Sequence, residues 1–103
     1  MRTAAEYKAL LTNFKQEFGG KFGIKELGFF GSVARGEHTE GSDLDVFVSL
    51  EKIEPFIMFD LKELLESLCK CKVDLIRLRD TLRPTLLDNI RKEGIYVGIV
   101  THI

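Results

Sequence analysis

The chain has 103 residues, 45% of them hydrophobic, and its 15 basic and 16 acidic side chains leave a formal charge of −1. This length predicts one domain over residues 1–103 and is too short for two substrate-binding lobes. The near-neutral charge argues against binding of nucleic acid through a basic face. Apolar runs fall short of the ~20 residues that cross a bilayer, and the first residues lack a signal-peptide core. We therefore expect a soluble, cytoplasmic protein with no membrane partner.

The first predicted element is an amphipathic helix over residues 3–18. Thr3 and Glu6 have the spacing of a capping box. Apolar side chains then recur at helical intervals, at Tyr7, Leu10, Leu11, Phe14 and Phe18. Gly19-Gly20 should end this helix, because glycine accepts the left-handed backbone conformation. The aromatic side chains of the stripe are expected in the core.

Two strands and a second helix are predicted next. The apolar segment 24–30 predicts a strand that runs into Gly31-Ser32, and the polar residues 36–42 predict a loop. Residues 44–50, rich in β-branched and aromatic side chains, predict the second strand. Pro55 suits the first turn of the following helix. The apolar face of that helix consists of Ile57, Leu61, Leu64, Leu65 and Leu68.

Residues 73–78 predict a third strand, and a last helix follows it. Asp80 or Thr81 could cap this helix, Pro84 must lie in its first turn or mark its true start, and Gly94 should end it.

Residues 95–100 predict either a fourth strand or a tail that packs elsewhere. The resulting order, α-β-β-α-β-α-β, predicts an α/β fold. Because the third strand is reached from the second through a helix, we expect a mixed sheet with helices packed on it.

Three aspartates carry the candidate chemistry. Asp43 and Asp45 stand two residues apart at the start of the second strand, so their side chains should share one face, roughly 6.5–7 Å apart. Asp74 lies among apolar residues in the third strand, where aspartate is unusual. If those strands are neighbours, the three carboxylates can meet. Two magnesium ions about 3.5–4 Å apart could then support an in-line attack on phosphorus.

Gly31-Ser32 and Arg35 add a candidate phosphate site. Glycine lets the backbone approach a phosphate, a helical turn that starts here presents N–H donors, and Ser32 adds a hydroxyl. Arg35 could pair with phosphate or with one of the aspartates. Taken singly, each of these features is more often a turn, a solvated loop end or a surface residue, so the interpretation depends on their combination.

The two cysteines, Cys69 and Cys71, are too few and too close in sequence for a disulfide framework. A bridge between them within one regular element would be strained. We expect two reduced thiols.

In combination, the candidate residues resemble a known family. Residues 31–36, Gly-Ser-Val-Ala-Arg-Gly, and 42–45, Ser-Asp-Leu-Asp, resemble the Gly-Ser-x-Ala-Arg-Gly … Ser-Asp-x-Asp pattern of minimal nucleotidyltransferases in the DNA polymerase β-like superfamily. The resemblance implies a palm-like fold and a magnesium site. The implied catalytic and metal-binding residues are Asp43, Asp45 and Asp74, and the implied nucleotide-binding residues, for ATP or another triphosphate, are Gly31, Ser32, Arg35 and Ser42.

The resemblance also implies a partner. Related proteins pair with a small helical HEPN-type toxin, act as its antitoxin, and in some cases attach AMP to it. We therefore expect a protein adenylyltransferase in a hetero-oligomer. Two alternatives remain open: a non-catalytic antitoxin that neutralises its partner by covering it, and a transferase that acts on RNA or a small molecule. Because the chain has little beyond the catalytic unit, the acceptor should dock on an exposed surface or a second protein should complete the site.

Overall fold

The computed structural model describes residues 2–79 and 82–98 and contains four helices and four strands in that part of the chain. In chain order they are α1 (Ala4–Phe22), β1 (Ile24–Phe30), α2 (Gly31–Arg35), β2 (Leu44–Leu50), α3 (Ile57–Cys69), β3 (Val73–Arg77), α4 (Pro84–Glu93) and β4 (Ile95–Val97). Over these residues, no helix combines the length and apolarity needed to span a bilayer.

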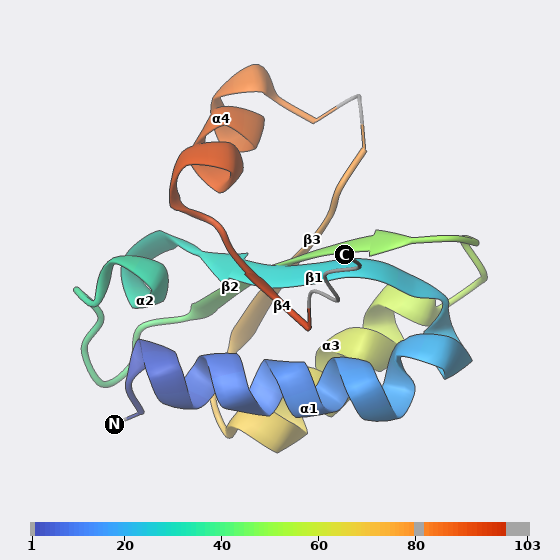
Figure 1. Ribbon diagram of the computed structural model, residues 1–103, viewed down its shortest axis with the longest axis horizontal. Helices are drawn as coiled ribbons and strands as arrows, with labels where there is room; N and C mark the ends of the chain where they lie inside the picture. Colours follow the sequence, from blue (N-terminus) through green and yellow to red (C-terminus); the bar gives the residue numbers. More distant parts are fainter. Residues whose placement is uncertain (1, 80–81, 99–103) are drawn as a thin grey trace, which may run out of the picture.

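The strands form one mixed sheet in the order β3-β2-β1-β4. β1 runs antiparallel to β2 and to β4, whereas β2 and β3 are parallel, and α3 supplies the crossover connection that parallel strands need. Helices α1 and α3 cover one face of the sheet and α4 lies over the other, with α2 beside one end of the strands (Figure 1). The predicted mixed sheet with packed helices is confirmed.

The predicted order of elements lacked α2, because its five residues were expected only as the start of a helical turn after residue 32. The first two strands have the predicted bounds, and the third ends one residue earlier, at Arg77. Pro84 is the first residue of α4, and Gly94 follows its last residue, as expected. Residues 95–97 form the predicted fourth strand, whereas residues 99–100 and the proposed caps Asp80 and Thr81 lie outside the described residues.

Helix α1 begins as predicted but ends later. The Thr3 hydroxyl accepts the Glu6 N–H at 3.2 Å, and the Glu6 carboxylate accepts the Thr3 N–H at 3.2 Å, which completes the capping box. The helix continues through Gly19-Gly20 to Phe22 and ends at Gly23, whose φ of 65° is left-handed. The added turn packs Phe22 against the core, and burial of an aromatic ring offsets the roughly 1 kcal/mol that each internal glycine costs.

Helix α3 begins later than predicted. Pro55 lies in a turn before the helix, and Phe56 takes a left-handed φ of 64°, so the helix starts only at Ile57. The Ile57 N–H donates to the Glu54 carbonyl at 3.2 Å, which closes that turn. The predicted apolar face of α3 is confirmed: Ile57, Leu61 and Leu65 are buried, and two further leucines of this face, at 64 and 68, are partly buried against the same core.

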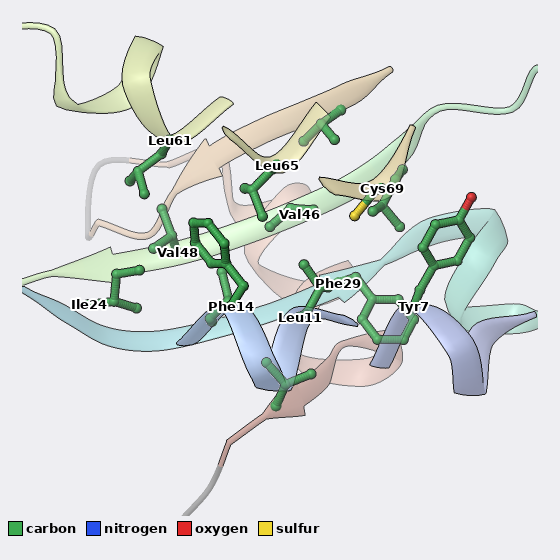
Figure 2. Close-up of a cluster of buried hydrophobic side chains, with 14 of the residues drawn as sticks. Tyr7, Leu11, Phe14, Ile24, Phe29, Val46, Val48, Leu61, Leu65 and Cys69 are labelled. Carbon is green, nitrogen blue, oxygen red and sulfur yellow. The ribbon is translucent and has the colours of Figure 1, made fainter. Parts of the chain in front are cut away.

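The main core lies between the sheet and helices α1 and α3 (Figure 2). Side chains from both helices meet alternate residues of the strands, including Tyr7, Leu11, Phe14, Phe29, Val46, Val48, Leu61, Leu65 and Cys69. Cys69 and Cys71 are free thiols, and burial raises the pKa of the Cys69 thiol to about 11. This thiol therefore behaves as a small core side chain.

The opposite face of the sheet carries a smaller apolar cluster beneath α4. Phe30, Phe47 and Ile90 are buried there. Gly28 makes room for this packing, because a Cβ at that position would overlap the Phe47 ring and the Ile95 carbonyl. The cluster anchors α4 on the face to which the even-numbered residues of β3 point.

The late end of α1 predicts opposite effects of alanine at two nearby glycines. Gly20→Ala adds a methyl group where no atom lies within 4 Å, in ordinary helical backbone, and should raise the free energy of unfolding by about 0.5–1 kcal/mol. Gly23→Ala puts a Cβ at φ 65° and should lower it by about 1–2 kcal/mol. Urea unfolding of the two variants measures both effects. A loss of stability in Gly20→Ala would place the helix end at Gly19-Gly20 after all.

Candidate active site

Parallel pairing of β2 with β3 sets Asp45 directly opposite Asp74 in the sheet. Because directly paired residues point to the same face, both carboxylates lie on the face that carries α4, away from the main core. Asp43 immediately precedes β2, two residues before Asp45, and is exposed. Two of the predicted aspartates thus lie on neighbouring strands, and the third lies just before one of them, at the same end of the sheet.

The three carboxylates affect one another electrostatically. The pKa of Asp45 is raised above its ordinary value of 3.8, first by partial burial, then by the charge of Asp74 and then by that of Asp43, while the charge of Arg35 lowers it. Like charges held this close disfavour ionisation of the most buried member of the group. The site therefore holds a concentration of negative charge that a cation would relieve.

Gly31 forms the other side of this site. It is the first residue of α2, with a left-handed φ of 76°, and a Cβ there would overlap the Asp45 Oδ2. Ser32 follows in the first turn of α2 and is partly buried. Glycine at 31 is thus required twice, by the backbone conformation and by the carboxylate packed against it.

The fit of this site to magnesium follows from its donors. Among the described residues, no three His, Cys, Asp or Glu side chains converge closely enough to hold one metal ion. Asp45 and Asp74 therefore share a face of the sheet, with Asp43 just before β2, and the three do not form a closed cage. Magnesium usually binds one or two carboxylates together with substrate phosphates, so an open carboxylate pair beside the turn at Gly31-Ser32 suits it. The donor chemistry fits the ion.

Arg35 pairs with two glutamates rather than with an aspartate in the described part of the chain. Its Nε donates to Glu37 Oε2 at 3.0 Å and its Nη1 to Glu93 Oε2 at 2.9 Å. Sequence reasoning missed Glu93, which lies 58 residues away on α4. Its place at the end of the predicted last helix did not indicate a contact with the motif.

Ser42, the remaining predicted nucleotide-binding residue, closes a turn in the loop before β2. Its hydroxyl accepts the Thr39 N–H at 3.0 Å, and its own N–H donates to the Thr39 carbonyl at 3.0 Å. These bonds order the backbone that leads into Asp43. In this structure Ser42 is thus placed to fix the loop beside the aspartates.

Comparisons with known proteins identify the family of the chain. A family model described as a nucleotidyltransferase domain matches residues 8–97. A relative in Thermococcus cleftensis, protein adenylyltransferase MntA, is 38% identical over 98 residues, which cover 94% of this chain and 98% of the relative.

Solved structures share the fold. A candidate minimal nucleotidyltransferase superposes with a TM-score of 0.68 at 34% identity, over 88% of each chain. A toxin–antitoxin structure with AMP-PNP gives a TM-score of 0.71 at 20% identity, over 86% of this chain and 70% of the other. A complex of a tri-AMPylated HEPN toxin from Shewanella oneidensis with its MNT antitoxin gives 0.65 at 17% identity, over 91% and 71%. At these low identities, the last two likenesses show a shared fold.

The raised pKa of Asp45 predicts how stability depends on pH. A carboxyl that binds its proton more tightly in the folded chain favours folding at acid pH, and this contribution is lost as pH rises through the raised pKa. At neutral pH the ionised Asp45 should therefore cost stability. In metal-free buffer, Asp45→Asn should raise the melting temperature at pH 7, and the gain should vanish as pH falls below 3.8.

The matched control is Asp88→Asn, which removes an exposed aspartate on α4. It should leave the melting temperature near that of the parent chain at both pH values. A lower melting temperature of Asp45→Asn at pH 7 would mean that Asp45 is stabilised, not strained, by its surroundings.

The packing of Gly31 against Asp45 predicts a measurable coupling. Gly36 has a similar φ of 72°, and a Cβ added there would meet no atom within 4 Å, so Gly36→Ala should cost only the backbone strain, about 1–2 kcal/mol. Gly31→Ala should cost about 1–3 kcal/mol more, because the new methyl group also displaces the carboxylate. In an Asp45→Ala background this excess should shrink. Chemical denaturation of the parent chain, Gly31→Ala, Asp45→Ala and the double variant gives the coupling free energy. Equal costs in both backgrounds would refute the contact.

Proposed function

This chain belongs to the nucleotidyltransferase domain family, and we propose that it moves AMP from ATP onto a hydroxyl group of a HEPN-type toxin and so acts as that toxin's antitoxin. The observation that carries the proposal is the strand register that brings Asp45 opposite Asp74, with Gly31 packed against Asp45. Two of the similar proteins support the choice of reaction and partner: one is named a protein adenylyltransferase, and the other is an MNT antitoxin bound to an AMPylated HEPN toxin.

The proposed reaction is a displacement at the α-phosphorus of ATP. The acceptor hydroxyl oxygen forms a bond to this phosphorus. The bond from the α-phosphorus to the oxygen that links it to the β-phosphorus breaks, and pyrophosphate leaves. Asp74 orients the hydroxyl and receives its proton. Gly31 and Ser32 hold the triphosphate next to the aspartates, with Arg35 and Ser42 at the edge of the nucleotide site.

Magnesium, as two ions bound by Asp43, Asp45 and Asp74, would supply positive charge to the phosphate oxygens and to the attacking oxygen. Partial burial, and after it the charges of Asp74 and Asp43, raise the pKa of Asp45, and a bound cation would relieve this concentration of negative charge. Because residue 31 is glycine, no side chain there would separate the carboxylate of Asp45 from the phosphates.

The proposal is tested by transfer of label from ATP. The chain is incubated with magnesium, ATP labelled at the α-phosphate, and a HEPN-type protein that binds the chain. Label should appear on the HEPN protein. Asp43→Ala combined with Asp45→Ala should reduce the label by roughly a hundredfold or more, because the chain would no longer hold the magnesium that balances the charge on the phosphates. Asp88→Ala, which changes an exposed aspartate on α4, should transfer normally.

Other outcomes identify other functions. A parent chain that binds the HEPN protein but transfers no label to it would contradict the proposal. If the double aspartate variant still neutralised the toxin fully, the chain would act by covering its partner. Label on RNA or on a small alcohol, with none on the HEPN protein, would identify a different acceptor.

A further inference from the structure

We propose that Glu93, the last residue of α4, is a positioning residue for the nucleotide. It holds the guanidinium of Arg35 in a fixed orientation beside the aspartates, where the remaining N–H groups of Arg35 bind a phosphate of the bound nucleotide. This inference rests on the proposed function and gives a role in it to a residue outside the sequence motif.

The contacts of Arg35 leave it able to bind a further acceptor. A guanidinium has five N–H donors in a rigid plane. In the described structure one of them, on Nε, donates to Glu37 at 3.0 Å and another, on Nη1, to Glu93 at 2.9 Å. Two carboxylates, one in the loop after α2 and one on α4, therefore set both the position and the plane of the guanidinium. Three donors remain for the planar, bidentate contact that arginine makes with phosphate.

Arg35 lies close to the carboxylates along a short helix. Helix α2 runs only from Gly31, which packs against Asp45, to Arg35. With a rise of 1.5 Å per residue, these two ends are about 6 Å apart along the helix axis. A phosphate held beside Gly31 and Asp45 therefore lies within reach of the Arg35 side chain. The position of that side chain then decides whether the contact forms.

Glu93 is a firm anchor because the chain around it is packed. The Gly94 N–H donates to the Ile90 carbonyl at 2.7 Å, and Ile90 is 1% exposed. A Cβ on Gly94 would lie 3.1 Å from the Phe47 ring, and β4 begins at the next residue, Ile95, which pairs with Phe29 of β1. The end of α4 is thus fixed where the chain passes from α4 into β4 of the sheet (Figure 1).

The Arg35–Glu93 pair contributes little to folding. The side chains are 42% and 33% exposed, and ion pairs this exposed add little to stability. Two glutamates around one arginine also leave no surplus positive charge. If only the net charge around Arg35 mattered, removal of the negative Glu93 would strengthen ATP binding. If Glu93 acts by orienting the guanidinium of Arg35, its removal weakens ATP binding. The two accounts therefore predict changes of opposite sign.

The test compares the KM for ATP with kcat in the label-transfer assay. Glu93→Ala should raise KM about three- to tenfold with little change in kcat, because an oriented contact to the nucleotide is lost. Glu93→Gln keeps an acceptor oxygen for Arg35 and should recover most of the parent KM. Lys92→Ala, next to Glu93 and exposed, is the control and should match the parent chain. Arg35→Ala combined with Glu93→Ala should be no worse than Arg35→Ala alone.

A KM that falls or stays unchanged in Glu93→Ala would overturn the proposal, as would independent, additive losses in the double variant. A melting temperature near that of the parent chain should accompany the rise in KM, which separates positioning from simple destabilisation. Calorimetry of AMP-PNP binding in the presence of magnesium compares the nucleotide affinity of the parent chain and the variants without any transfer reaction. If the parent chain binds AMP-PNP but labels no acceptor, the proposed function fails, while weaker binding to Glu93→Ala still supports the positioning role.

Discussion

The parallel pairing of β2 with β3 is the constraint on which the candidate site depends. It sets two aspartates side by side on one face of the sheet, with a third just before β2. Partial burial, and after it the like charges of Asp74 and Asp43, raise the pKa of Asp45 and so oppose its ionisation. Folding to this register therefore requires a core strong enough to hold the carboxylates together.

That core lies on the opposite face of the same strands. Residues 44, 46 and 48 of β2 are fully buried against α1 and α3, while Asp45 and Phe47 point to the face that carries α4. Because side chains alternate along a strand, a slip of one residue would exchange the two sets. The same burial that stabilises the fold thus fixes the orientation of Asp45, and stability is coupled to the geometry of the site.

Much of this arrangement follows from local patterns in the chain. Several features could be predicted because each depends on residues close together in sequence. They are the capping box, the helical stripe of α1, the first two strands and the i, i+2 spacing of Asp43 and Asp45. The motif of residues 31–36 also indicated the family correctly. Two of the errors in the fold, at Gly19-Gly20 and at Pro55, arose where packing of Phe22 and a left-handed Phe56 outweighed local propensity.

Contacts between distant residues could not be derived in this way. Nothing in the sequence required Asp74 to pair with Asp45 rather than at another register, or Arg35 to meet Glu93, because strand order and helix placement follow from the packing of the whole core. The residue types and local elements, including the three aspartates and the glycine-rich turn, were encoded in the chain itself. Their meeting at one end of one sheet face depends on long-range burial, whose energy is shared among many residues and leaves no local signal.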